Sequence, residues 1–206
     1  MKKRPALFFV NSIIIIVLIT LIGCASTEPS RFYMLQSLAG KDITQKSPST
    51  AHHVSIGIGP VEIPDYLDRP QIVTRSGPNE MKFAEFDRWA GSLRDNIASV
   101  LAENLSLMLS TDGVFLYPWN PALDIDYGIN VNILHLDSIP GDHVTLKVLW
   151  TVSGRKENKE LITRVSDIKE KLNASGYNAI VDAISRTFVI LSAEIAAEIR
   201  AIVGKK

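Results

Sequence analysis

Apolar residues alternate with polar or small residues over several stretches of the chain, a pattern typical of half-buried β-strands. These stretches are residues 32–35, 54–61, 71–75, 81–83, 127–133, 144–152 and 161–168. Residues 127–133 and 144–152 flank Pro140-Gly141, a dipeptide suited to the centre of a type II turn, and therefore predict an antiparallel hairpin. Its second strand should bury one alternating set of side chains: Val144, Leu146, Val148, Trp150 and Val152.

Two other stretches have apolar residues at intervals of three or four, as amphipathic helices do. The first runs from Trp89 to Ser110, with Arg94, Asp95, Glu103 and Asn104 on its polar side, and Asp112-Gly113 should end it. The second runs from about Tyr177 to Ile202. The order of strands, helix, strands and helix predicts a single α+β domain, a mostly antiparallel sheet with two long amphipathic helices packed on it.

The first residues of the chain have a different pattern. Met1 to Arg4 is basic, and Ala6 to Ile22 is almost entirely apolar. This combination is typical of a secretory signal peptide. A transmembrane anchor is the alternative, although this apolar run is slightly shorter than the about 20 residues that a membrane span needs.

Cys24, the only cysteine, directly follows this apolar run. The sequence Leu21-Ile22-Gly23-Cys24 resembles a bacterial lipobox, in which the thiol is acylated and the preceding peptide bond is cut; a chance cysteine after a membrane helix is the alternative. We therefore expect residues 1–23 to be a lipoprotein signal peptide, 24–31 a lipidated tether and 32–206 the domain. The expected lipid is a diacylglycerol and an N-acyl chain on Cys24, and we expect no other cofactor.

Ala25 would be the second residue of the mature chain, the position at which enteric bacteria use Asp to retain lipoproteins in the inner membrane. We therefore expect an outer-membrane location facing the periplasm. Lys2, Lys3 and Arg4 would leave with the signal peptide, so the mature chain has three more acidic than basic residues. This charge excludes a strongly basic nucleic-acid-binding surface.

The sequence contains no convincing catalytic or metal-binding motif. Its four histidines, His52, His53, His135 and His143, have no cysteine or carboxylate at ligand spacing, whereas a metal site needs three or four converging ligands. No G-x-S-x-G elbow occurs, and Gly57-Ile58-Gly59-Pro60 lacks the third glycine and the following helix of a dinucleotide loop. We therefore expect neither an enzyme nor a metalloprotein.

Several motifs together resemble the ABC-type transport auxiliary lipoproteins of the PqiC type. They are the lipobox, Phe32-Tyr33-Met34-Leu35, the strand at 54–60, Tyr66-Leu67-Asp68-Arg69-Pro70-Gln71-Ile72-Val73, Arg88-Trp89 and the stretch 191–196. The resemblance implies an outer-membrane lipoprotein that works with an MCE-domain system moving lipids between membranes and so supports membrane integrity. It also implies assembly as a homo-oligomeric ring. Residues 117–126 differ from the family's pattern, which leaves the role of that loop open.

Tyr66, Leu67, Asp68, Arg69 and Pro70 are the candidate contact with a partner or another subunit. Pro64 and Pro70 exclude a helix interior here, and Tyr, Asp and Arg are residue types that anchor interfaces. The alternative is that Asp68 and Arg69 brace a turn against the helix expected to start at Trp89.

Two functions remain open. One is a docking subunit of a transport system, and the other is a stand-alone lipid or small-molecule carrier with an apolar cavity of several hundred Å³. Strict alternation in the strands and single apolar stripes on the helices indicate a filled core, which favours the subunit.

Overall fold

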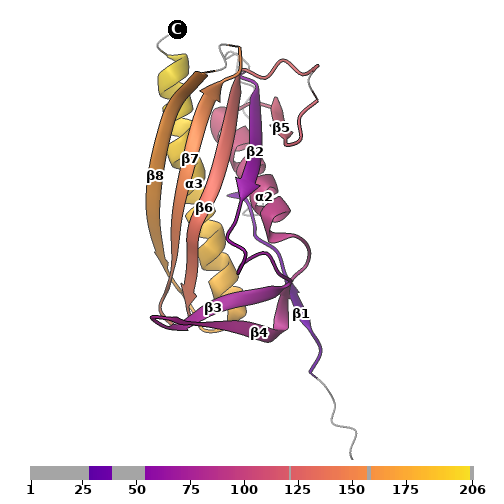
Figure 1. The fold of residues 1–206 in the computed structure, drawn as a ribbon, viewed down its shortest axis with the longest axis vertical. Helices are drawn as coiled ribbons and strands as arrows, with labels where there is room; N and C mark the ends of the chain where they lie inside the picture. The colour runs from indigo at the N-terminus through magenta and orange to yellow at the C-terminus, as the bar shows by residue number, and fades with distance from the viewer. Residues whose placement is uncertain (1–27, 39–53, 121, 157–158, 205–206) are drawn as a thin grey trace, which may run out of the picture.

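The computed structural model describes residues 28–38, 54–120, 122–156 and 159–204. Within these residues, two helices and eight strands form one α+β domain, which confirms the predicted fold class. The strands form two sheets, where the sequence predicted one. The larger sheet and the helices make up the body of the molecule, and the smaller sheet lies across one end of it (Figure 1).

The five-stranded sheet has the order β5-β2-β6-β7-β8. Its strands are β2 (Ile56–Glu62), β5 (Val114–Leu116), β6 (Tyr127–Ile139), β7 (His143–Gly154) and β8 (Lys159–Lys171). Strands β6, β7 and β8 are antiparallel, as predicted, and Gly141 adopts the positive φ of 77° that the turn between β6 and β7 requires. Strand β2 instead runs parallel to both β5 and β6, and the alternation pattern contains no signal for this arrangement.

The three-stranded sheet has the order β1-β4-β3. Its strands are β1 (Arg31–Tyr33), β3 (Gln71–Gly77) and β4 (Glu80–Trp89). Strands β3 and β4, at the predicted strands 71–75 and 81–83, form a hairpin, while β1 pairs in parallel with the end of β4. Sequence periodicity cannot predict this pairing because the two strands are far apart in the chain.

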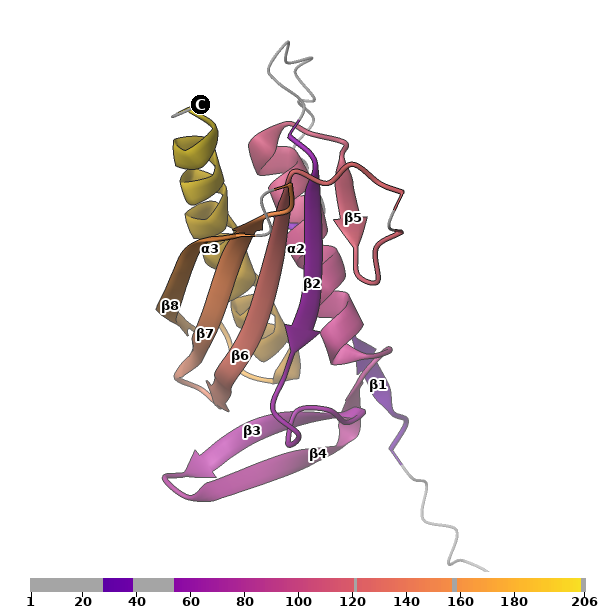
Figure 2. The same ribbon diagram turned by 45° about the horizontal axis from the view of Figure 1, so that its top comes forward.

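The helices are α2 (Leu93–Leu109) and α3 (Tyr177–Val203), and both cover the same face of the larger sheet (Figures 1 and 2). The predicted start of the first helix at Trp89 is wrong, because Trp89 is the last residue of β4. Ser92 is the N-cap instead, and its side chain accepts a hydrogen bond from the Asp95 amide at 3.2 Å. The predicted termination of the helix by Asp112-Gly113 is also wrong, because Leu109 is its last residue and Ser110 caps it in a left-handed conformation with φ of 54°.

The core lies between the larger sheet and the helices. All five side chains predicted to face inward on β7, from Val144 to Val152, are buried, so the predicted phase of this strand is confirmed. Trp150 and Phe188 are the largest fully buried side chains. The predicted polar position of Asn104 is wrong, because this residue is completely buried between α2 and α3.

The molecule has two distinct ends along its long axis (Figure 1). We define the tether end as β1, β3, β4 and the turn Tyr66–Pro70, since the chain leading back to Cys24 leaves from β1. The far end consists of β5, the loop 117–126 and the C-terminus of α3. Cys24 itself and the expected signal peptide lie outside the described residues.

Candidate functional site at the tether end

The first described strand is fixed to the domain through one buried carboxylate. Arg31 and Asp87 are register partners in the parallel pair β1–β4. The Arg31 guanidinium donates to both Asp87 oxygens, with Nε 2.9 Å from Oδ1 and Nη2 3.1 Å from Oδ2. The Tyr33 hydroxyl also donates to Oδ1 at 2.7 Å, and the Asp87 side chain is 5% exposed. Such bidentate, charge-assisted bonds impose geometry, so they set the position of β1 on β4.

The chain beyond β1 runs over the helices, and side chains hold its backbone. Three amides donate to helix side chains: Leu35 to Asn96 Oδ1 at 2.7 Å, Gln36 to Ser185 Oγ at 3.1 Å and Leu38 to Asn104 Oδ1 at 2.8 Å. We call residues 31–38 the strap. Because a buried amide without a partner is costly, these side chains replace the ladder that a neighbouring strand would supply.

Asn104 has the most enclosed position among the residues that hold the strap. It is fully buried on α2, where its Oδ1 accepts from Leu38 and its Nδ2 donates to Ser192 Oγ on α3 at 3.3 Å. One amide group therefore joins the strap to both helices. The sequence contains one signal of this role, a polar residue at a position of the apolar stripe, whereas the helical pattern predicts Asn104 on the polar side.

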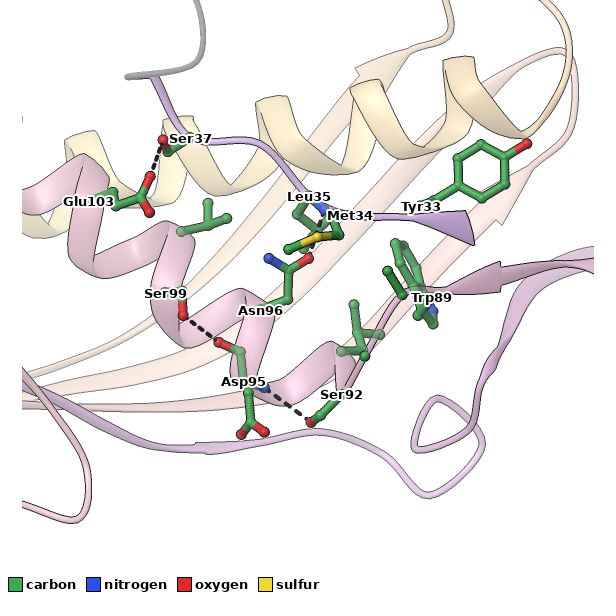
Figure 3. A pocket seen from close by; sticks show the side chains of 14 residues that line it. Tyr33, Met34, Leu35, Ser37, Trp89, Ser92, Asp95, Asn96, Ser99 and Glu103 are labelled. Carbon is green, nitrogen blue, oxygen red and sulfur yellow. Dashed lines mark hydrogen bonds between the residues drawn. The ribbon is translucent and has the colours of Figure 1, made fainter. Parts of the chain in front are cut away.

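A hollow of about 450 Å³ lies between the strap and the first half of α2 (Figure 3). Its polar side chains mostly bond within the chain: Ser92 to the Asp95 amide, Ser99 to the Asp95 carbonyl and Ser37 to Glu103. Its lining contains no histidine, cysteine or lysine. Several polar groups of the hollow therefore already serve the fold.

The turn Tyr66–Pro70 lies at the same end, and each of its residues contacts its own domain. Leu67 is buried, and the Tyr66 hydroxyl accepts from the Leu136 amide at 3.4 Å. The Pro70 carbonyl accepts from the Trp89 amide at 2.7 Å.

Asp68 and Arg69 make the charged contacts of this turn. Asp68 pairs with Arg94 of α2 at 2.8 Å, with both side chains about half exposed, and the Arg69 guanidinium stacks 4.0 Å from the centre of the Phe83 ring. These contacts match the bracing alternative for Asp68. A partner or subunit contact through this turn stays a prediction.

Burial raises the pKa of three tyrosines around the small sheet. The hydroxyls of Tyr33, Tyr66 and Tyr177 are all withdrawn from water, which disfavours their charged forms, and Asp87 raises the pKa of Tyr33 and Tyr177 further. The described residues contain no group of three or more His, Cys, Asp or Glu side chains able to hold a metal ion. Nor does any described helix have the length and apolar character needed to cross a membrane.

At the far end, the structure assigns a packing role to the loop 117–126. Trp119 lies so close to Gly57 that a Cβ there would sit 2.6 Å from the indole Cε2, and Gly128 gives it similar room. Tyr117 meets the Trp119 ring edge-on at 5.6 Å between centroids, and the Arg155 guanidinium lies 5.0 Å from that ring. Gly57 of β2 and Gly128 of β6 therefore make room for the Trp119 ring to pack on the larger sheet. This packing accounts for the glycines without a phosphate-binding role.

A family model described as the ABC-type transport auxiliary lipoprotein component matches residues 33–196. The chain therefore belongs to this family, of which the PqiC-type lipoproteins are members. As a member, it is an auxiliary lipoprotein of an ABC-type transport system. No curated relative matches the chain.

Two solved structures share the fold. One, described as an uncharacterized protein, has a TM-score of 0.67 at 21% identity and covers 84% of this chain and 99% of its own. The other, protein XCC0632 from Xanthomonas campestris, has a TM-score of 0.64 at 12% identity, with 81% and 93% covered. The PelC dodecamer from Paraburkholderia phytofirmans is similar only at a TM-score of 0.42 and 12% identity, covering 73% and 89%, and supports no conclusion about assembly.

Proposed function

We propose that this protein is an outer-membrane-anchored lipoprotein facing the periplasm and a non-catalytic auxiliary subunit of an MCE/ABC-type intermembrane lipid transport system. The observation that carries the proposal is the strap. Its side-chain clamps hold the domain by one end, beginning at Arg31, seven positions after the proposed anchor Cys24. A domain held in this way directs its opposite end away from the membrane, toward a partner that spans the periplasm.

The anchor in this proposal is the acylated Cys24, with a diacylglycerol on sulfur and an N-acyl chain. Two or more acyl chains are enough for stable anchoring, where a single chain is marginal. Ala25 in place of Asp supports the outer membrane as its location. Support for membrane integrity would follow from lipid transport between the two membranes.

The alternative, a stand-alone lipid carrier, finds less support in the packing. The space between the larger sheet and α3 contains the buried side chains of Trp150 and Phe188. A hollow of about 490 Å³ opens to solvent between β2 and α2 and includes the charged residues Glu62, Arg94 and Asp95. A carrier for acyl chains needs an enclosed, largely apolar cavity instead.

The Cys24→Ala variant tests the anchor. We expect loss of palmitate labelling and loss of outer-membrane fractionation, because the only acylation site is removed. Mature-length protein that still fractionates with the outer membrane and incorporates palmitate would refute the lipobox interpretation.

Affinity capture of the tagged, lipidated protein tests the partnership. We expect an MCE-domain protein to co-purify after crosslinking in the periplasm. Native mass spectrometry on the same preparation separates the two functions: one lipid bound non-covalently per chain, without an MCE protein, would support the carrier instead.

A further inference from the structure

The strap exposes two large apolar side chains at the tether end. Phe32 is 65% exposed and Met34 is 60% exposed, the two highest values among the large hydrophobic residues described as exposed. They alternate with the more buried Tyr33 and Leu35, so both extend from the solvent side of the strap, where Met34 also lines the open hollow beside α2 (Figure 3). Strands normally present polar residues on this side, and the fold itself gives no reason for two apolar ones here.

The outward orientation of these side chains is fixed. A shift of β1 by one residue would turn Phe32 inward, but the Arg31–Asp87 pair and the Tyr33–Asp87 hydrogen bond determine the register. The bond from the Leu35 amide to Asn96 extends this control to the next residue. Their exposure is therefore built into the structure.

The chain length determines what can cover these residues. Phe32 lies eight positions after Cys24, a distance of at most about 30 Å when the chain is fully extended. Arg88, the register partner of Phe32, puts a cationic side chain on the same face of the small sheet. Aromatic and long apolar side chains next to arginine are typical of surfaces that enter the headgroup region of a bilayer.

We propose that Phe32 and Met34 insert into the phospholipid surface of the membrane that holds the anchor. This inference rests on the proposed acylation of Cys24. The acyl chains supply the attachment, and the two side chains supply a second contact, which begins eight positions after Cys24 in the chain. Two separated contacts restrict the tilt of the domain, so the far end points into the periplasm.

Label quenching on the full-length lipoprotein tests this inference. The protein is reconstituted into vesicles of phosphatidylethanolamine and phosphatidylglycerol, with Met34→Cys carrying the environment-sensitive thiol dye NBD. An acylated Cys24 does not react with the dye, so the new cysteine is the single labelling site. Val165→Cys is the matched control, because Val165 is 55% exposed on β8, away from the strap.

We expect blue-shifted emission at position 34 and quenching by doxyl-labelled lipid, with neither effect at position 165. Adding Phe32→Asp should reduce the quenching at 34, while circular dichroism and vesicle flotation stay unchanged. Equal quenching at both positions would overturn the inference. A blue shift without lipid quenching would also overturn it, because a protein surface such as a second copy would then cover the strap.

Failure of the proposed anchor gives a different result. In that case the wild-type chain would react with the dye at Cys24 and would not float with the vesicles. Both readouts are independent of Phe32 and Met34. This outcome overturns the anchor and, with it, the membrane contact of the strap.

Discussion

The body and the tether end of this protein are stabilised by different interactions. Between the larger sheet and α3 the contacts are mainly apolar, and the Trp150 indole reaches its polar partner, Ser166 Oγ, at 2.9 Å within the buried layer. The tether end also buries apolar side chains such as Leu67 and Ile72, and to these it adds ion pairs and side-chain bonds to backbone amides. Apolar burial is non-directional and scales with area, whereas these bonds require particular geometry. We infer that the body supplies most of the stability and the tether end supplies orientation.

The comparison also explains why polar side chains of β4 and the helices hold the inner side of the strap. Strand β1 has only three residues, too few for a backbone ladder to hold the chain that leads to the membrane. Asp87, Asn96 and Asn104 complete the attachment from three different positions on β4 and α2. Pulling on the anchor therefore loads several directional bonds together.

The largest expected effect comes from breaking the body. Trp150→Ala should lower the free energy of unfolding by about 3–5 kcal/mol, because it leaves a cavity and removes the hydrogen bond that the indole donates to Ser166. Urea denaturation measures this change. Thr151→Ala, at the half-buried neighbouring position, is the control and should stay within about 0.5 kcal/mol of wild type. An unchanged Trp150→Ala variant, together with unfolding by Thr151→Asp, would mean that the buried face of β7 is the opposite one.

Asn104→Ala should loosen the strap at a smaller cost of about 1–3 kcal/mol, since the Leu38 amide loses its acceptor at the fully buried Asn104 position. In this variant, hydrogen exchange should accelerate more at the Leu38 amide than at amides in β7. In the control Asn96→Ala, the partly exposed site allows water to replace the lost acceptor, so the effect should be smaller. Equal losses in the two variants would argue against a special role for Asn104.

Alkaline pH should weaken the tether end. The pKa of Tyr33, Tyr66 and Tyr177 is raised from the ordinary value of 10.0, so the folded state favours the protonated hydroxyls. Their stabilising contribution is complete below pH 10 and is lost as the pH rises above 10 through the folded-state pKa values. Unfolding curves at about pH 8 and about pH 11 measure the loss. A variant with phenylalanine at all three positions should lose less stability; an unchanged loss would assign the effect to other groups.

The smallest effect on stability should come from Arg69→Ala, because the lost stacking on Phe83 is worth about 0.5–1 kcal/mol at an exposed site. If the turn Tyr66–Pro70 contacts a partner or subunit, ring assembly or partner capture should nevertheless be lost. Arg94→Ala, which removes the partner of Asp68, controls for bracing alone. Intact assembly together with a melting temperature several degrees lower would contradict the interface hypothesis.

The candidate site was only partly predictable. The sequence predicts Tyr66–Pro70 as a candidate contact from its prolines and its interface-type residues. The structure adds the contacts of these residues within the chain. The sequence pattern does not predict that Asn96 and Asn104 hold the strap. Their role depends on the strap, which approaches them from more than sixty positions earlier in the chain.

The local pattern of the sequence by itself determined the hairpin of β6 and β7, the buried face of β7, the second helix and the α+β class, because period and turn chemistry act between near neighbours. Only the tertiary structure decided the split into two sheets, the parallel pairing of β1 with β4 and the burial of Asn104. It also decided the packing of Trp119 on Gly57. Each of these features joins residues far apart in the chain, and their contacts exist only once the core has brought the segments together.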